Sequence, residues 1–409
     1  MTASRHVELS RGLHTVDPAA WTELDRAGDV DTGRACLHFR EQLEPGPPVV
    51  LTLDDATGVC AAACGVLTVP ETALTSHPWK LLCDEQMLRL AGDEDAGAVR
   101  ARHAALVSDA GGGGPGHDPV ELLTRTLGTV FVVRGLDRSQ VLLAGHLSVE
   151  DRRRAAALLV TSAQRYAADG LAGAIAFPFV LPADGLLAGT LAAAGFRRLL
   201  ITAVAGFDLS AYESPAAFLA SLPRSARYRH RKEPAELAGA GLAVTEIPLA
   251  DHVDRVAALE AQNATQHGGR AAPERIARAR RFMADTLGDA VRVAAAARDG
   301  QLVACGLYLL GRTRCLSLAY GCDYTVADRA TAYPCLSLYQ PVALALRHRV
   351  PEVRLGFEGF QAKVLRGARL VDREMWLWTP DPRRRERLEP LLRFMDARTR
   401  GHLSRYRRD

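Results

Sequence analysis

Two spacings of apolar residues recur along the chain, and each predicts one kind of element. Short apolar runs are typical of strands, whereas apolar residues three or four positions apart are typical of helices. The clearest strand of the first half is 129–133, which reads Thr-Val-Phe-Val-Val. The clearest helix is 149–168, where Ser148 is the expected N-cap and Gly170 lies just past the end. The same reasoning predicts helices at 21–26 and 185–194 and strands at 49–53, 62–69, 174–177 and 196–204.

A second set of elements begins near Tyr212. Ser214 and Pro215 predict a helix start, because serine caps the first turn and proline fits its first position. Asp299-Gly300, between two apolar runs, predicts a β-hairpin with a two-residue turn. The remaining patterns predict helices at 224–237, 251–266, 273–287 and 330–349, a basic C-terminal helix, and strands at 242–247, 313–320, 353–357 and 374–378.

Each half therefore combines helices with an antiparallel meander and a late parallel crossover. This combination is typical of a mixed α/β or α+β architecture, in which helices flank mixed sheets. A chain of 409 residues is long enough for two domains, each with its own core. We place the boundary near 205–215, which gives an N-terminal domain 1–210 and a C-terminal domain 211–409.

Composition excludes several classes of protein. Hydrophobic residues make up 48% and charged residues 24% of the chain, which is ordinary for a globular protein. The most apolar stretch, 171–187, is interrupted by Pro178 and Pro182, so we expect no membrane span. No secretory signal opens the sequence, and the expected location is the cytoplasm. The eight cysteines lack the spacing of a metal site, so we expect neither a metal nor a tightly bound cofactor.

The distribution of charge is more informative than its total. A net charge of +4 does not by itself indicate nucleic-acid binding, and nothing predicts a DNA partner. Basic residues cluster in 224–232 and in 383–408. In the first cluster Arg224, Arg227 and Arg231 recur at helical spacing, so one helix face would present all three to phosphates. The C-terminal cluster is interpreted as a solvated helix face.

Lysine is scarce in this chain. Of 51 basic residues 48 are arginine, and the lysines are Lys80, Lys232 and Lys363. An ammonium group acts as a compact point charge and can lose its proton, whereas a guanidinium group stays charged and planar. Each lysine is therefore a candidate for a specific role.

Three segments of the second half resemble the Fem-type, GNAT-related acyltransferases, a group that includes peptidoglycan-bridge aminoacyltransferases. They are the run 222–232, Leu-Pro-Arg-Ser-Ala-Arg-Tyr-Arg-His-Arg-Lys, the Asp299-Gly300 hairpin, and the loop 357–367, Phe-Glu-Gly-Phe-Gln-Ala-Lys-Val-Leu-Arg-Gly. The resemblance covers roughly 218–378, and the Gly195-Phe196 turn adds a GNAT-like feature to the first half. It implies tandem GNAT-like α/β domains, with mixed sheets flanked by helices, and an acyltransferase activity.

The resemblance also bears on the loop that contains Lys363. In Fem-type enzymes this loop tends to read Phe-Lys-x-x-Phe-Gly, with its lysine near the acyl-transfer centre. Lys363 and Gly367 match the pattern, whereas Ala362 and Arg366 replace its aromatic residues. The loop therefore leaves the type of donor open.

Amide formation requires a base that takes a proton from the amine and a group that stabilises the oxyanion. Lys363, just after a predicted strand, is the candidate for the oxyanion, with a surface lysine as the alternative. The inner stripe of helix 251–266 continues to Glu260 and His267, which are candidates for the base unless they only reach solvent. Glu358 is a third candidate, or else a partner of Lys363 in an ion pair. The candidates for binding substrate or its phosphates are Arg224, Arg227, Arg231, Lys232, Tyr320, Tyr333 and Arg366.

Two donors stay possible. The segment 266–271, Gln-His-Gly-Gly-Arg-Ala, has the letters of a GNAT coenzyme-A loop, but it follows a helix and not the central strand. We interpret it as a turn between helices, and we expect aminoacyl-tRNA as the donor and the amine of a small molecule or peptide precursor as the acceptor. One alternative is an acyl-CoA-dependent N-acyltransferase of the same fold. The other is a non-catalytic protein that binds cell-wall precursors.

Overall fold

The computed structural model describes residues 6–27, 29–72, 77–83, 85–90, 94–112, 118–269, 271–326 and 329–407. Its contacts divide the chain into two compact units. The first comprises Met1–Gly28, Thr32–Ala203 and Asp372–Asp409, and the second comprises Asp29–Asp31 and Val204–Val371. The sequence predicted one boundary, between 210 and 211, whereas the contacts divide the chain after Ala203 and again after Val371. It also placed the C-terminal helix in the second domain, whereas the contacts assign that helix to the first unit.

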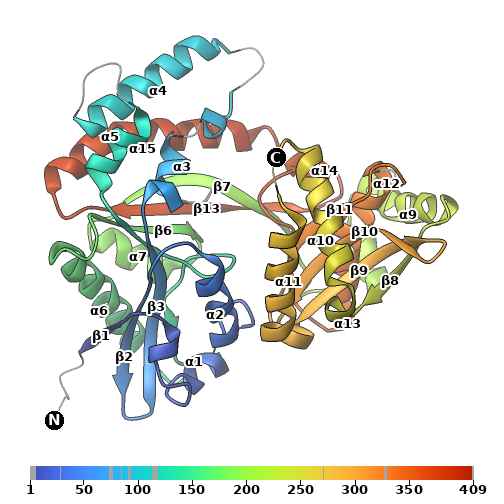
Figure 1. Ribbon diagram of the computed structural model, residues 1–409, viewed down its shortest axis with the longest axis horizontal. Coiled ribbons are helices and arrows are strands. Elements are labelled where there is room, and N and C mark those ends of the chain that lie inside the picture. The colour runs from blue at the N-terminus through green and yellow to red at the C-terminus, as the bar shows by residue number, and fades with distance from the viewer. Residues whose placement is uncertain are drawn as a thin grey trace. The chain divides into compact units, whose positions relative to one another are not determined.

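The first unit is built on a mixed sheet with helices on both faces (Figure 1). The pair β4–β6 is parallel, while β1–β2, β2–β3, β3–β4 and β6–β13 are antiparallel. A short strand, β5 (Leu142–Leu143), pairs with β3. The strand order is β1 (Val7–Ser10), β2 (Pro48–Asp55), β3 (Gly58–Thr68), β4 (Val130–Val133), β6 (Ala174–Val180), β13 (Arg369–Trp378) and β7 (Arg197–Asp208).

Two apolar cores, one on each face of this sheet, hold its helices. One core takes in α6 and α7 through Leu159 and Leu187, and the other takes in α4, α5 and α15. The helices of this unit are α1 (Thr22–Ala27), α2 (Arg34–Leu43), α3 (Pro78–Cys83), α4 (Ala96–Gly111), α5 (Pro119–Leu127), α6 (Val149–Ala168), α7 (Gly185–Ala193) and α15 (Pro382–Ser404).

The C-terminal helix belongs to the first unit because of its apolar stripe. Leu388, Leu391 and Met395 lie buried in the same cluster as the apolar side of α5. Burying one such side chain contributes about 1.5–3 kcal/mol, so the stripe outweighs the charges around it. The amide of Leu200 also donates to the carboxylate of Asp396 over 2.7 Å. The many arginines of 383–408 hid this stripe from sequence analysis.

The second unit is also built on mixed strand pairing, which begins at residues 204–208 of β7 and belongs to the same 13-stranded sheet. Strands β11 and β12 are parallel, and the pairs β12–β7, β10–β11, β9–β10 and β8–β9 are antiparallel. The strand order is β7, β12 (Glu352–Arg354), β11 (Arg314–Cys322), β10 (Gln301–Leu310), β9 (Val291–Arg298) and β8 (Ala243–Ile247). The helices are α8 (Pro215–Ser221), α9 (Arg224–Gly239), α10 (Leu249–Gln266), α11 (Pro273–Leu287), α12 (Arg329–Pro334), α13 (Gln340–Arg347) and α14 (Phe360–Val364).

The predicted hairpin is confirmed. Arg298 and Gln301 are paired across a two-residue turn, in which Asp299 has φ 49° and Gly300 has φ 77°. Two residues with positive φ make the turn that matches the twist of an antiparallel pair. The predicted helix 330–349 is interrupted, because a π-helical segment, Cys335–Tyr339, separates α12 from α13. Such insertions into a helix occur frequently at functional sites.

The crossing of α10 over β11 depends on Gly321, and its substitution gives a first prediction. A Cβ at Gly321 would lie 2.7 Å from the backbone nitrogen of Glu260. We expect Gly321→Ala to lower the free energy of unfolding by about 1–3 kcal/mol, because backbone on both sides must move. Gly189→Ala is the matched control, since a Cβ there meets nothing within 4 Å. Chemical denaturation that finds both variants equally stable would contradict this account of the crossing.

Candidate active site

Strands β11 and β12 separate soon after they pair. Their register runs from Arg314 opposite Glu352 to Leu316 opposite Arg354 and ends there. Strand β11 continues to Cys322, whereas the chain after β12 turns into the segment 355–359. We call the place where 317–319 and 355–359 diverge, after the pairing has ended, the β11–β12 fork.

The middle of β11 differs from its ends at this fork. Residues 317–319 are half-buried, while the rest of the strand is buried. The register with β10 also shifts here, because Leu307 faces Ala319 and Tyr308 faces Ser317, which leaves Leu318 as an extra residue. Bulges of this kind bend a strand and are frequent beside active sites. Strand β11 is partly exposed, bulged and released from its neighbour here, and these features together make the fork the candidate active site.

Lys363 lies at the fork, on the short helix α14. Its side chain is only 4% exposed. The Nζ atom donates to the carbonyl of Leu355 over 2.5 Å and to that of Gly356 over 3.3 Å. Burial lowers the pKa of Lys363 to about 8, and the negative charge of Glu358 opposes this shift. The predicted surface alternative for Lys363 is therefore wrong, because the ammonium is buried and held by two carbonyls.

A buried ion pair fixes α14 against α9. The guanidinium of Arg366 donates to Glu233 through Nε over 2.8 Å and through Nη2 over 2.6 Å. The hydroxyl of Tyr339, in the π-helical segment, donates to the same carboxylate. His230 makes a 3.0 Å hydrogen bond to the carbonyl of Arg366. A helix as short as α14 has little stability of its own, so these contacts position Lys363.

Charge explains the direction of the pKa shifts in this group. Burial acts to lower the pKa of Arg366, but Glu233 outweighs it and the pKa is raised. Burial and then Glu233 raise the pKa of Tyr339. The sequence predicted Arg366 as a substrate-binding residue. The structure instead pairs it with Glu233, so its cation is neutralised inside the protein.

Two tyrosines of the prediction lie together near the fork. The rings of Tyr320 and Tyr333 meet edge to face with 5.2 Å between centroids. The hydroxyl of Tyr333 lies 3.5 Å from the position that a Cβ on Gly359 would take, which places it beside the loop of the fork. The hydroxyl of Tyr320 is buried, and this burial raises its pKa.

The three candidates for the base have different surroundings. Glu260 is buried and forms a two-pronged ion pair with Arg280 over 2.8 and 2.6 Å, which joins α10 to α11. Both carboxylate oxygens of Glu260 are bound to one guanidinium, so this side chain is poorly placed to take a proton from a substrate. His267 is exposed at the end of α10. Glu358 is exposed on the loop of the fork, and among the described residues it forms no ion pair, with Lys363 or any other cation.

The basic residues of α9 lie on its outer face. Arg224, Arg231 and Lys232 are exposed, and Lys232 pairs with Glu236 over 3.1 Å. Arg227 is half-buried and donates to the carbonyl of Ala220 over 3.0 Å. The segment 266–269 joins α10 to α11, so the predicted inter-helix turn is confirmed, with position 270 outside the described residues.

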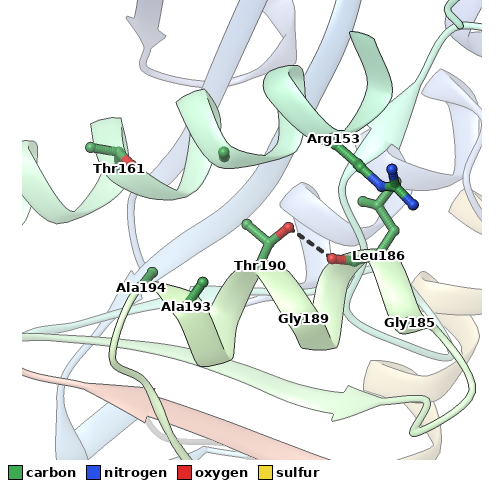
Figure 2. A pocket seen from close by; sticks show the side chains of 9 residues that line it. Arg153, Thr161, Gly185, Leu186, Gly189, Thr190, Ala193 and Ala194 are labelled. Atoms are coloured by element: carbon green, nitrogen blue, oxygen red, sulfur yellow. Dashed lines mark hydrogen bonds between the residues drawn. The ribbon is translucent and has the colours of Figure 1, made fainter. Parts of the chain in front are cut away.

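Three surface hollows lie in the described part of the chain, and none of them is lined by a residue of the fork. The hollow in Figure 2, of about 430 Å³, lies between α6 and α7 and is lined mainly by small residues such as Gly185, Gly189 and Ala193. The hydroxyl of Thr190 is bonded to the carbonyl of Leu186 over 2.7 Å, and Arg153 is the one charged residue of the lining. The lining of this hollow includes no carboxylate or imidazole that could act as the base. No helix in the described part of the chain combines the length and apolar character needed to cross a membrane.

Sequence analysis missed the buried partners of the site. Glu233 and Tyr339 were not candidates, although Glu233 directly follows the basic run and Tyr339 precedes Pro341 in a disturbed helix. Glu233 and His230 could have been noticed in the sequence, because they lie on the apolar side of a helix whose other polar residues are mostly basic. Both residues bind Arg366, which lies 133 residues after Glu233 in the sequence. No local sequence pattern predicts a contact over that separation.

Comparisons with known proteins identify the family and the fold of this chain. A family model named FemAB-like, described as peptidoglycan biosynthesis/recognition, matches residues 143–408, well over half of the chain and including α9 and α14. The structure of FemX has 11% sequence identity, a TM-score of 0.56, and matches over 90% of this chain and 96% of its own. A search of curated protein sequences gave no match.

Two further solved structures are similar to a lesser degree. A tandem GNAT protein from the clavulanic acid biosynthesis pathway has 16% identity and a TM-score of 0.46, over 92% of this chain and 99% of its own. The C-terminal domain of a putative lysylphosphatidylglycerol synthetase from Agrobacterium fabrum has 15% identity and a TM-score of 0.45, over 66% and 82%.

The likeness to FemX confirms the predicted fold class, and the family match confirms the predicted Fem-type resemblance. The match extends across the fork, the lysine beneath it and the ion pair that positions that lysine. The chain belongs to the FemAB-like family and is an acyltransferase of the GNAT-related Fem type.

Proposed function

We propose that this acyltransferase moves an aminoacyl group from aminoacyl-tRNA to the amine of a small-molecule or peptide precursor. The observation that carries the proposal is the ammonium of Lys363, buried at the β11–β12 fork and held by two carbonyls. The family description points to a peptidoglycan precursor as the acceptor.

The proposed reaction places the acyl carbonyl at the fork. The amine nitrogen attacks the carbonyl carbon, the new C–N bond forms, and the ester C–O bond to the ribose breaks. A lysine ammonium has three N–H donors, and Leu355 and Gly356 accept two of them. The third N–H can donate to the oxyanion of the tetrahedral intermediate, and this supports Lys363 in that role.

The proton lost by the attacking amine needs an acceptor near the same place. Glu358 is the candidate that the geometry favours, because it lies on the fork loop, is exposed, and feels the charge of Lys363. The other two candidates for the base are less favoured. Glu260 is bound to Arg280, and His267 is exposed at the end of α10. The proton taken by Glu358 then passes to the departing ribose oxygen, which balances the transfer.

Support for a tRNA donor comes from α9 and from the turn after α10. Three exposed cations on the outer face of α9 suit a polyanionic partner. The glycines of 266–269 follow a helix, so they do not form the strand-to-helix loop that cradles a pyrophosphate. An acyl-CoA donor is the competing case that experiment has to separate.

Removing the Lys363 charge tests the core of the proposal. We expect Lys363→Met to lower kcat by about 100- to 1,000-fold, the effect of deleting one oxyanion donor. Lys80→Met, which removes an exposed lysine of the first unit, should leave kcat unchanged. Steady-state kinetics at saturating donor gives both values, and a Lys363→Met enzyme within twofold of the parent would remove Lys363 from the mechanism.

The pH profile of the parent enzyme gives an independent check. The oxyanion donor is the protonated form of Lys363, so kcat should be fully developed below pH 8 and fall as pH rises through about 8. Lys363→Met should lose this alkaline limb while keeping whatever limb the base produces. An alkaline limb that persists in Lys363→Met would show that another group titrates there.

The ion pair beneath Lys363 gives a stability prediction. We expect Glu233→Gln to lower the free energy of unfolding by about 3 kcal/mol, because it leaves the buried guanidinium of Arg366 without its counter-charge. Glu236→Gln on the same helix is the control, since its pair with Lys232 is exposed and should change stability by less than about 1 kcal/mol. Urea denaturation measures both, and equal midpoints would mean that Glu233 does not hold α14.

The donor is tested by parallel assays. Purified protein is incubated with labelled acyl-CoA and, separately, with charged tRNA and a peptidoglycan-precursor peptide bearing a free amine. We expect product only from charged tRNA, abolished by RNase, with binding that weakens steeply as salt rises. Product only from the thioester would replace the tRNA donor with coenzyme A and leave the role of Lys363 to be judged by its own variant.

A further inference from the structure

The outer face of α9 displays an aromatic ring that the proposed function does not yet use. Tyr228 is 63% exposed, the second most exposed of the large apolar side chains in the described part of the chain. Arg224 lies four residues before it, and Arg231 and Lys232 lie three and four residues after it, so all four side chains share one helix face.

The opposite face of α9 explains why the ring points outward. Ala226, Glu233 and Leu237 are buried, and they fix the rotation of the helix. Glu233 also holds Arg366, two residues after the end of α14, so rotation of α9 that buried Tyr228 would break the pair beneath Lys363. The exposure of Tyr228 therefore follows from the contacts that position the candidate active site.

The surroundings of Tyr228 select the chemistry of its partner. The ammonium of Lys232 lies 5.9 Å from the ring centroid. Arg224 and Arg231 form no ion pair with the described residues, and Glu236, bound to Lys232, is the acid close by on this helix. An apolar protein surface would cover the ring only by burying several uncompensated cations. A single-stranded nucleic acid matches the face, because its bases stack on aromatic rings and its phosphates bind cations.

We propose that Tyr228 is a base-stacking platform for the single-stranded 3′ end of the donor RNA, with Arg224 and Arg231 holding the adjacent phosphates. This inference rests on the proposed tRNA donor and names the surface that receives it. One helix then carries both tasks, since its outer face binds the RNA and its inner face positions Lys363 through Glu233 and Arg366.

Direct binding of a short RNA tests the proposal without requiring turnover. The probe is a fluorescent single-stranded RNA ending in CCA, titrated with the full chain at several salt concentrations. Tyr228→Ala should weaken binding roughly tenfold, while Tyr228→Phe, which keeps the ring, should bind as the parent does. Val149→Ala, which trims a 66% exposed apolar residue on α6, is the control and should have no effect.

The salt dependence separates the ring from the cations. Tyr228→Ala should leave the slope of log affinity against log salt unchanged, because stacking releases no counterions. The double variant Arg224→Gln, Arg231→Gln should make that slope shallower by roughly 1.4, or about 0.7 per phosphate on a single strand. Circular dichroism of each variant checks that the fold is intact.

Each remaining outcome bears on a different claim. Tyr228→Ala that binds the RNA as well as the parent overturns the stacking platform, while the tRNA donor stands if charged tRNA still gives product. A parent chain that binds no RNA and uses only a thioester overturns the stacking platform together with the tRNA donor. An equal loss in Tyr228→Ala and Tyr228→Phe also contradicts stacking, because it would trace the effect to the hydroxyl.

Discussion

The buried ammonium of Lys363 is the constraint around which the second unit is organised. Lowering its pKa from 10.5 to about 8 corresponds to roughly 3 kcal/mol of destabilisation when the group is charged. Between these two values the unfolded chain binds more protons than the folded one, so stability increases as pH rises through that window. Other contacts must offset this cost at neutral pH. The carbonyls of Leu355 and Gly356 do so in part, and both follow β12, where the pairing with β11 has ended.

Those carbonyls are themselves held by the sheet. The amide of Leu355 donates to Ala205 of β7 over 2.8 Å, and the amide of Ala205 donates to Gly356 over 3.2 Å. The chain beyond β12 therefore keeps its bond to β7 while it leaves β11. The loss of pairing with β11 forms the fork, while the bonds to β7 hold the two carbonyls that accept from Lys363. The ion pair of Glu233 and Arg366 then fixes the helix that bears the lysine from the opposite direction.

Sequence analysis succeeded where the cause is local. The Asp299-Gly300 turn was predictable because positive φ at two successive residues demands particular side chains, and helix spans followed from apolar spacing. Lys363 stood out by its scarcity. The ion pairs of the second unit could not be predicted from the sequence. Glu260 contacts Arg280, and Glu233 contacts Arg366, only once the helices have packed. The inner face of helix 251–266 was predicted correctly as far as Glu260, which is buried. The carboxylate of Glu260, however, is bound to Arg280 of α11.

These ion pairs give a physical reason for arginine in place of lysine at two positions. Arg280 and Arg366 each bind a carboxylate with two parallel bonds, which the planar guanidinium is shaped to do. At Lys363 the acceptors are two successive backbone carbonyls, and the proposed reaction would add an oxyanion as a third. A guanidinium there would have five donors for fewer acceptors, and it would also stay charged at any pH. In a chain where 48 of 51 basic residues are arginine, an ammonium stands at the position where two carbonyls, and in the proposed reaction an oxyanion, bind one nitrogen.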